Sequence, residues 1–589
     1  MNMKITRVFD LLPFLKMYYP ENNIFSNKEN GQWVHYDTDA FIRNVDEISL
    51  GLLSIGVKKD DKVANMSPNR PEWNFVDFAV MQMGAVHLPL YPTLSESDLK
   101  YIINDSETKV LFVANQELYD KVCKVKSECP TLQYIISYEK VNDSNVMHWE
   151  DLKLKGDASQ MEKVSEYRNS VQPDDLLTLI YTSGTTGNPK GVMLTHDNLV
   201  SNFKSSNPLI PEGSHTALSF LPLSHIFERM VVYMYLSKGV HVYYAESLEK
   251  IADNLKEVNP HMFTTVPRLL EKVYDKIVLK GSELTGIKKA LFFWALDLGL
   301  KYEYDGKNGW WYEMQLWLAN KIIFKKWREA LGGNILAICA GGAALQERLA
   351  RVFWAAGIPV LQGYGLTETS PVVTVNGIDK GLRYFGTCGP TIPGVEVKIA
   401  ADGEILAKGP NIMKGYYKKP EATAEVIDSD GWFHTGDIGE FVEGRYLKIT
   451  DRKKEIFKTA GGKYVAPQII ENKFKESKFI EQIMVVGENK KFPAALIIPS
   501  FVYLKDWCTI KGINYVSNEQ IIKEEVVINR IQREVDALNS NFGQWEQIKK
   551  FVLLPREFTI DEGELTPKLS MKRKAIMEKY NDKIELMYS

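Results

Sequence analysis

Residues 181–191 read YTSGTTGNPKG and follow an apolar run that is typical of a buried strand. Glycines let backbone N–H groups approach an anion, while hydroxyl side chains and Lys190 add donors and a positive charge. The segment therefore suits a phosphate cradle, with a flexible surface turn as the alternative. It is not a Walker A motif, because its glycines are too close together and Pro189 precedes the lysine. Nor does Ser183 lie in the G-x-S-x-G context of a hydrolase nucleophile.

A second segment, GYGLTE at 363–368, begins like a dinucleotide-binding fingerprint. Glu368 stands where that fingerprint needs its third glycine, and its carboxylate would oppose a pyrophosphate. Beside a polyphosphate it would instead suit Mg²⁺, which is usually held by one or two carboxylates together with phosphate oxygens. A glutamate that complements a helix dipole is the alternative interpretation.

The elements that would position these segments alternate between strand-like and helical patterns through the first 380 residues, which predicts βαβ units and a mostly parallel sheet. Three glycine-bearing segments, at 176–191, 334–345 and 358–370, each follow an apolar strand-like run. Ligands bind beyond the carboxyl ends of strands in an open parallel sheet, so we expect the three loops to face one crevice. We also predict a strand at residues 195–206.

The length of 589 residues exceeds what one hydrophobic core supports, so at least two domains are expected. Short strands punctuated by glycine and proline predict a β subdomain at about 381–452, which closes a large domain at 1–452. A new mixture of helices and strands predicts a separate domain at 453–589.

Composition excludes several classes of protein. A net charge of −3 argues against nucleic-acid binding, and five cysteines without a CxxC pair indicate neither a disulfide framework nor a zinc ribbon. The N-terminal sequence lacks a secretory signal, and no window is long and apolar enough to span a membrane. We therefore expect a cytoplasmic protein.

Four motifs in order carry a resemblance: residues 181–191, GYGLTET at 363–369, GWFHTGD at 431–437 and DRKKEIFKTAGGKYVAP at 451–467. From about residue 30 to 574 the sequence closely resembles the adenylate-forming superfamily of acyl-CoA synthetases, luciferases and adenylation domains. The implied fold is α/β, with a large N-terminal domain of mainly parallel sheets flanked by helices, a small β-barrel-like subdomain and a small mobile α+β C-terminal domain.

The resemblance implies a ligase that forms an acyl-adenylate from a carboxylic acid and ATP with Mg²⁺, and then transfers the acyl group to coenzyme A. Thr185, Thr186 and Lys190 would hold the β- and γ-phosphates, Thr367 the α-phosphate, and Glu368 with Thr186 the Mg²⁺. Tyr364 would lie against adenine, and Asp437 would accept both ribose hydroxyls. The implied binding residues are Thr182, Ser183, Gly184, Thr185, Thr186, Gly187, Lys190, Gly341, Gly342, Ala343, Gln362, Gly363, Tyr364, Gly365, Thr367, Asp437 and Arg452.

The same resemblance makes Lys454 the pivot between the two half-reactions and places Gly461 and Gly462 against the pantetheine arm after rotation. The family's adenylation lysine falls on Ser570. Two explanations stay open: Lys568 or Lys572 takes over the task, which a flexible lysine stem permits, or adenylation is slow.

The segments LPLSHIFERM at 221–230 and VPRLLEKVY at 266–274 resemble the long-chain fatty acyl-CoA synthetase branch. In that branch His225 lines the acyl entrance, and Ile226, Phe227, Met230 and Val231 are the predicted tunnel wall. Other open readings are an aryl-CoA or acyl-AMP ligase, or an ATP-binding member with weakened catalysis.

An insertion at 280–333 interleaves aromatic residues with lysines. It could contact a membrane peripherally, although core packing explains the aromatics equally well. The expected partners are a fatty acid, ATP and coenzyme A, and the sequence leaves a homodimer open.

Overall fold

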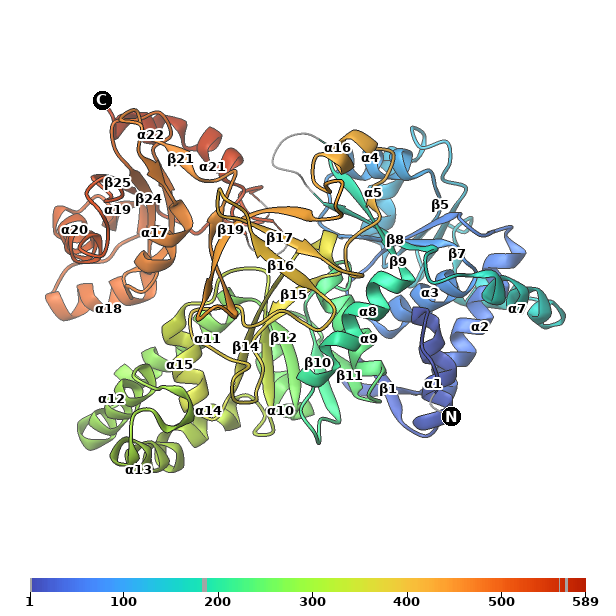
Figure 1. Cartoon of the computed structure of the whole chain (residues 1–589), viewed down its shortest axis with the longest axis horizontal. Helices are drawn as coiled ribbons and strands as arrows, with labels where there is room; N and C mark the ends of the chain where they lie inside the picture. Colours follow the sequence, from blue (N-terminus) through green and yellow to red (C-terminus); the bar gives the residue numbers. More distant parts are fainter. Residues whose placement is uncertain (1–2, 183–187, 561, 567–569) are drawn as a thin grey trace.

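The computed structural model describes residues 3–182, 188–560, 562–566 and 570–589. Two eight-stranded sheets and their helices form the main body, on the right and in the centre of Figure 1. The C-terminal region, in orange and red, lies at one end, and a group of helices around α12 and α13 projects below it. A mixed α/β architecture with mainly parallel sheets is therefore confirmed.

The first sheet has a parallel centre, with antiparallel strands at both edges. Its central strands are short and almost wholly buried, as expected when helices cover both faces of a sheet. In spatial order it contains β15 (Val372–Val375), β14 (Val360–Gly365), β13 (Ala337–Ala340), β12 (Met262–Thr265), β10 (Thr216–Ser219), β11 (His241–Tyr244), β1 (Asn23–Glu29) and β2 (Gln32–Asp37).

The second sheet is parallel from β8 to β7, whereas β9 and β18 are antiparallel at its other edge. In spatial order it contains β18 (Gly415–Tyr416), β9 (Lys190–Thr195), β8 (Leu176–Thr182), β4 (Val86–Leu90), β3 (Lys62–Met66), β5 (Thr108–Val113), β6 (Tyr134–Ser137) and β7 (Met147–His148).

Two sequence expectations are wrong here. The segment 176–191 contributes to an antiparallel pair, β8 and β9, in the second sheet, whereas the other two glycine-bearing loops leave β13 and β14 of the first sheet. The three loops thus do not share one sheet edge. Residues 196–206 form helix α8 (His196–Ser206) rather than a strand, because Thr195 and Asn198 form a reciprocal capping box that starts a helix.

Between the sheets, helix α9 (Ile226–Leu236) buries two charged residues side by side. Arg229 Nε donates to Asp77 Oδ2 of α3 (Pro71–Gln82) at 3.1 Å, and Arg229 Nη1 donates to Thr178 of β8 at 2.8 Å. This ion pair ties α9 to both α3 and the second sheet.

Glu228 points to the first sheet, where it accepts hydrogen bonds from Ser219 of β10 and Thr264 of β12. Burial raises the pKa of its carboxyl to about 7, against the two hydroxyl donors that lower it.

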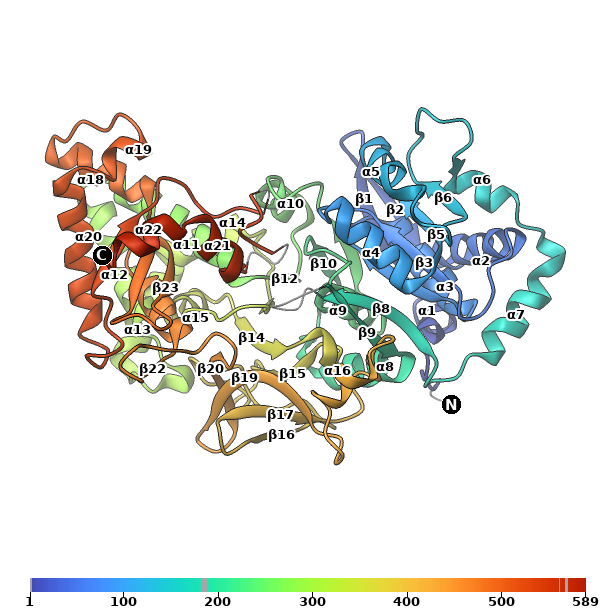
Figure 2. The same ribbon diagram turned by 90° about the horizontal axis from the view of Figure 1, so that it is seen from above.

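The predicted β subdomain is a four-stranded antiparallel sheet in the order β16 (Glu396–Ile399), β17 (Glu404–Lys408), β19 (Phe433–Val442) and β20 (Tyr446–Arg452). The C-terminal region contains a three-stranded sheet, β23 (Ile480–Val486), β24 (Ala494–Pro499) and β25 (Lys550–Leu553), and packs it against α17 (Pro467–Phe474) and α20 (Glu525–Asn539). Figure 2 shows α21 (Arg573–Lys579) reaching from this region toward the middle of the molecule.

A cluster of charges joins the C-terminal region to helix α11 (Pro267–Ser282) of the main body. Arg268 makes an ion pair with Glu481 of β23 and a second one, at 3.2 Å, with Glu557. It also contacts Glu271 on its own helix at 3.3 Å. Nearby, burial and the neighbouring charge of Glu481 together raise the pKa of Asp275 to about 6. One arginine thus holds several carboxylates together at this junction.

No helix in the described part of the chain is both long enough and apolar enough to cross a bilayer.

Candidate active site

A cavity of about 1550 Å³ opens where the two sheets, the β subdomain and the C-terminal region meet. Residues from all three predicted glycine-bearing loops line it, so the prediction of a shared crevice is confirmed although the loops come from different sheets. The residues predicted to bind nucleotide that line it are Thr182, Lys190, Gly341, Gly342, Ala343, Gln362, Gly363, Tyr364, Gly365, Thr367, Asp437 and Arg452. Ser183, Gly184, Thr185, Thr186 and Gly187 lie outside the described residues.

Two glycines have clear structural reasons. Gly342, in the turn after β13, has a φ of +81°, which strains any residue with a side chain. A Cβ at Gly365 would lie 1.8 Å from the carbonyl oxygen of Pro371, so no larger residue fits there. Backbone conformation therefore explains the first glycine, and close packing explains the second.

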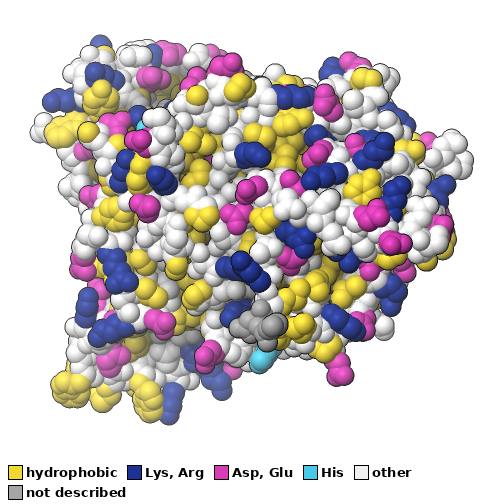
Figure 3. All heavy atoms as spheres, turned by 45° about the vertical axis from the view of Figure 1, so that its right-hand side comes forward, with side chains coloured by type: hydrophobic (Ala, Val, Ile, Leu, Met, Phe, Trp, Pro, Cys, Tyr) yellow, Lys and Arg dark blue, Asp and Glu magenta, His cyan; other side chains and the backbone are white. Residues whose placement is uncertain are grey.

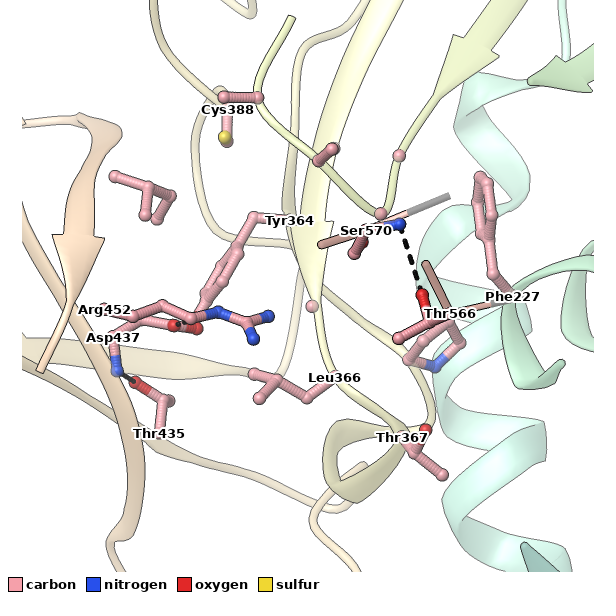
Figure 4. Close-up of a pocket in the computed structure, with 18 of the residues that line it drawn as sticks. Phe227, Tyr364, Leu366, Thr367, Cys388, Thr435, Asp437, Arg452, Thr566 and Ser570 are labelled. Carbon is pink, nitrogen blue, oxygen red and sulfur yellow. Dashed lines mark hydrogen bonds and ion pairs between the residues drawn. The ribbon is translucent and has the colours of Figure 1, made fainter. Parts of the chain in front are cut away.

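Tyr364, Asp437 and Arg452 form a polar group on one side of the cavity (Figure 4). The hydroxyl of Tyr364 donates to Asp437 Oδ2 at 2.7 Å, and Arg452 Nε lies 3.5 Å from Asp437 Oδ1. Asp437 on β19 and Arg452 on β20 are direct partners in this antiparallel pair of strands. The register of this hairpin therefore brings a residue of the third sequence motif against the start of the fourth.

The neighbours of Asp437 act on its pKa in both directions, since Glu455 and Glu368 raise it as burial does. Burial raises the pKa of this carboxyl, while Arg452 and the hydrogen bond from Tyr364 lower it. Burial also raises the pKa of the Tyr364 phenol well above its usual value, and the neighbouring carboxylate adds to this. Tyr364 therefore stays a hydrogen-bond donor at any physiological pH.

Tyr416, a residue that sequence reasoning missed, contacts both Lys190 and Glu368. Lys190 Nζ lies 4.9 Å from the centre of the Tyr416 ring, and the Tyr416 hydroxyl donates to Glu368 Oε1 at 3.0 Å. Tyr416 belongs to β18, which pairs with β9, and nothing in the local pattern distinguishes it from a packing residue. The edge strand thus links a lysine and a carboxylate that come from different sheets.

The side of the cavity opposite to Asp437 is largely apolar and is formed by α9. His225 caps this helix by accepting a hydrogen bond from the backbone N–H of Phe227 at 3.0 Å, and it lines the cavity. Phe227, Met230 and Val231 line the cavity as predicted, whereas Ile226 is buried in the core and does not. Met234, one turn further along, extends the same face.

The C-terminal region contributes Lys454, Thr566, Ser570 and Lys572 to the cavity lining. The backbone N–H of Ser570 donates to Thr566 Oγ1 at 3.2 Å, and that of Lys572 donates to the Glu564 carbonyl at 2.8 Å. These contacts hold Thr566 and Ser570 at the cavity (Figure 4). Lys568 lies outside the described residues, and Gly461 and Gly462 are exposed and do not line the cavity.

The described residues contain no group of three or more His, Cys, Asp or Glu side chains arranged to hold a metal ion. Glu368 lines the cavity without belonging to any such group of the described residues. Such an arrangement suits only an ion that brings most of its own ligands with it.

The cavity geometry and the ordered motifs agree with the sequence comparisons. Residues 19–417 match the family described as AMP-binding enzyme, and residues 455–589 match its C-terminal domain. The chain belongs to the AMP-binding enzyme family.

Two relatives and one solved structure make the similarity more specific. Long-chain-fatty-acid–CoA ligase FadD15 of Mycobacterium bovis is 32% identical over 577 residues, which cover 97% of this chain and 95% of that protein. Long chain acyl-CoA synthetase 7, peroxisomal, of Arabidopsis thaliana is 33% identical over 592 residues, covering 95% of this chain and 82% of that protein. The crystal structure of the adenylation domain of the carboxylate reductase GR01_22995 from Mycobacterium chelonae has the same fold, with a TM-score of 0.77 at 21% identity and coverage of 100% of this chain and 92% of that chain.

Proposed function

We propose that this enzyme converts long-chain fatty acids to their coenzyme A thioesters through an acyl-adenylate. A carboxylate oxygen forms a bond to the α-phosphorus of ATP, and the bond to the leaving pyrophosphate breaks. The thiolate of coenzyme A then bonds to the acyl carbon, and AMP leaves. The observation that carries this proposal is one cavity with a polar group at Asp437 and an apolar wall on α9, in a chain whose relatives are named long-chain acyl-CoA ligases.

The polar group suits a nucleoside. Asp437 has two acceptor oxygens, which match the two hydroxyls of a ribose, and Arg452 lies beside it to bind the same nucleotide. Tyr364 presents its ring from the same side of the cavity, where an adenine would stack between it and the Gly341–Ala343 turn. Thr367 and Lys190 would then contact the phosphates, together with the hydroxyls of Thr185 and Thr186.

Mg²⁺ fits this site as an ion that arrives with ATP. Glu368 offers one carboxylate oxygen to it, and the other, Oε1, accepts the hydrogen bond from Tyr416. When bound, the ion would neutralise charge on the phosphates. Tyr416 in turn orients the carboxylate, and its ring holds Lys190 on the side where the same phosphates would lie.

Lys572 is the residue that we assign to the role usually taken by the lysine at the Ser570 position. It lines the cavity, and its flexible stem can bring the ammonium to the reacting carboxylate and α-phosphate. Its neighbour Arg573 cannot take this role, since it makes an ion pair with Glu471 at 2.7 Å inside the C-terminal region. We therefore retain the explanation in which a neighbouring lysine takes over the task, with Lys572 as the preferred candidate.

We propose that the chain divides into domains at 1–452 and 453–589 and that Lys454 is the pivot between them. Lys453 makes ion pairs with Asp402 at 2.7 Å and Glu404 at 2.8 Å, so the β subdomain holds the chain up to this residue. Lys454, the next residue, is exposed and lines the cavity. With Lys572 at the cavity and Gly461 and Gly462 away from it, the orientation described here suits adenylation, and rotation would bring the two glycines to the pantetheine arm.

The substrates of this proposal are a fatty acid, ATP and coenzyme A. A long-chain acid partitions into lipid because each buried CH₂ contributes roughly 0.8 kcal/mol. Peripheral contact with a lipid surface is therefore part of the proposed function.

The test is a panel of acids from acetate to C18, scored for AMP and pyrophosphate with and without coenzyme A. Palmitate should yield AMP and a thioester, while benzoate should not react. Product with benzoate but not palmitate would indicate an aryl-CoA ligase, and release of ADP would overturn the adenylation scheme.

A further inference from the structure

The helices between residues 286 and 326 leave a cluster of large apolar side chains in solvent. Trp310 is 78% exposed, and Trp311 and Trp317 are each 57% exposed. They lie on α13 (Trp310–Ala319), and further exposed apolar residues come from α12 (Gly286–Leu300) and from the turn of π-helix that continues α13 at Asn320–Phe324. The other exposed members are Ile287, Phe293, Met314, Leu318 and Ile322. We call this set the aromatic surface.

Core packing does not account for these residues. The aromatic side chains of the same region that serve the core, Phe292, Phe324 and Trp327, are buried, and Leu316 and Ala319 form the inward face of α13. The exposed residues recur on the opposite face of this helix at the spacing of successive turns. The helix is thus apolar on both faces, which is unusual for a helix that meets only water on one of them.

Lysines surround the aromatic surface. Lys321 Nζ lies 3.8 Å from the centre of the Trp317 ring, and Lys325 and Lys326 follow on the next turn. Lys288 is exposed on α12 beside Ile287. Figure 3 shows hydrophobic side chains protruding at the lower left, where Figure 1 places α12 and α13, with Lys and Arg side chains next to them.

The acidic side chains of this region are already engaged with basic residues, as Glu303 is with Arg351 and Asp305 with Arg383, or are set back from the surface. Asp297 pairs with Lys301 at 2.6 Å, and Glu329 lies 3.8 Å from Lys325. Glu313, on α13 itself, is only partly exposed. The side that carries the tryptophans is therefore net positive.

We propose that the aromatic surface docks on an anionic lipid bilayer, from which the enzyme collects its fatty acid; this inference rests on the proposed function. Tryptophan rings and lysine stems suit the headgroup region, where the rings meet acyl chains and the ammonium groups meet phosphates. A second copy of the chain is the poorer occupant, because the core of a protein interface is depleted of lysine and would have to desolvate these charges.

The docking helices are fixed to the part of the molecule that lines the cavity. Helix α12 packs closely on α15 (Glu347–Ala355), since a Cβ at Gly299 would lie 2.7 Å from Val352 Cγ2. The chain enters α15 directly from the turn at residues 341–347, which lines the cavity. A bilayer bound at the aromatic surface would therefore be held in a constant position relative to the cavity.

The experiment is co-sedimentation of the full chain with vesicles, made either of phosphatidylcholine alone or of phosphatidylcholine with phosphatidylglycerol. The wild-type chain should bind the anionic vesicles and lose binding as salt is raised. Replacing Trp310, Trp311 and Trp317 by serine should weaken partitioning at least about tenfold, and Lys321→Glu with Lys325→Glu should weaken it on anionic vesicles alone. Equal binding of wild type and both variants would overturn the proposal.

Trp545→Ser is the matched control. Trp545 lies in the C-terminal region, is 50% exposed and has Lys463 Nζ 5.6 Å from its ring, so it copies the chemistry of Trp317 at another place. This variant should bind vesicles as the wild type does. If Trp545→Ser lost as much vesicle binding as the triple tryptophan variant, binding would be nonspecific, and the assignment to the aromatic surface would be overturned.

Activity separates this proposal from the proposed function. With octanoate in solution the tryptophan variant should match the wild type, whereas with palmitate supplied in anionic vesicles it should be slower. If the wild type releases no AMP with any fatty acid, the proposed function fails. If the wild type activates detergent-dispersed palmitate but does not bind vesicles, the docking proposal alone fails. If the tryptophan substitutions convert a dimer to monomers and leave vesicle binding intact, the aromatic surface is instead an interface between copies.

Discussion

Arg268→Ala should shift the enzyme away from the orientation that suits adenylation. The side chains of Arg268 and its partner Glu481 are only 17% and 15% exposed, so their ion pair is screened little by solvent. A hydrogen bond between charged groups contributes roughly 1.5–3 kcal/mol, and Arg268 also reaches Glu557. Without the arginine, Glu271, Glu481 and Glu557 repel one another. If the substitution removes about 2 kcal/mol of interaction free energy, the orientation that suits adenylation becomes about 30-fold less favoured relative to the rotated orientation.

The assay measures the two half-reactions separately. Pyrophosphate exchange dependent on fatty acid reports adenylate formation, and it should fall by up to about 30-fold. Transfer from a preformed acyl-adenylate to coenzyme A reports the second step, and it should stay equal or become faster. The rate of adenylate formation by Arg268→Lys should lie between those of the wild type and Arg268→Ala, because lysine keeps the charge but not the forked geometry.

Lys272→Ala is the control for this junction. Lys272 is 56% exposed and lies 3.8 Å from Glu557, so its pair is weak and both half-reactions should be nearly unchanged. If Arg268→Ala slows both half-reactions equally, or neither, the ion pairs do not bias the orientation and the reasoning is refuted.

Other predictions address the cavity and the core. Asp437→Asn should raise the KM for ATP roughly 10-fold or more, measured by pyrophosphate exchange, because one acceptor oxygen becomes a donor. Lys572→Ala should lower acyl-adenylate formation by roughly 100-fold, while Lys574→Ala, outside the cavity lining, should not; equal rates would exclude Lys572. Lys454→Pro should retain adenylate formation and lose thioester formation, which the same two assays distinguish. Glu228→Gln should be as stable as the wild type at pH 4 and more stable by about 3 kcal/mol at pH 8 in urea titrations. The reason is that a pKa raised from 4.5 to about 7 costs stability as pH rises through this window, and a constant difference would refute it.

Sequence reasoning succeeded where a function depends on local pattern. The resemblance of four ordered motifs to a known family was enough to place Tyr364, Thr367 and Asp437 at one cavity. It failed where the outcome depends on pairing between distant segments. An apolar strand does not reveal which sheet it will join, so the antiparallel pairing of β8 with β9 was missed, and so was Tyr416, whose position depends on β18 pairing with β9.

Two further errors have local causes. The capping pair at Thr195 and Asn198 was readable from the sequence and would have identified α8 as a helix. Ile226 was predicted for the tunnel wall together with Phe227, but successive residues on a helix point about 100° apart, and Ile226 faces the core. The ion pairs of Arg268 with Glu481 and Glu557 could not be found at all, since these partners follow it by more than 200 residues.

The hydrogen bond from Tyr364 to Asp437 has a consequence for turnover. Asp437 is buried, and any step that vacates its neighbourhood would ordinarily strand a negative charge without compensation. Because the Tyr364 phenol and Arg452 already contact the carboxylate, the charge of Asp437 stays compensated by the protein after AMP leaves. Release of AMP therefore costs less free energy, and the empty enzyme does not have to rearrange the pocket before it binds the next nucleotide.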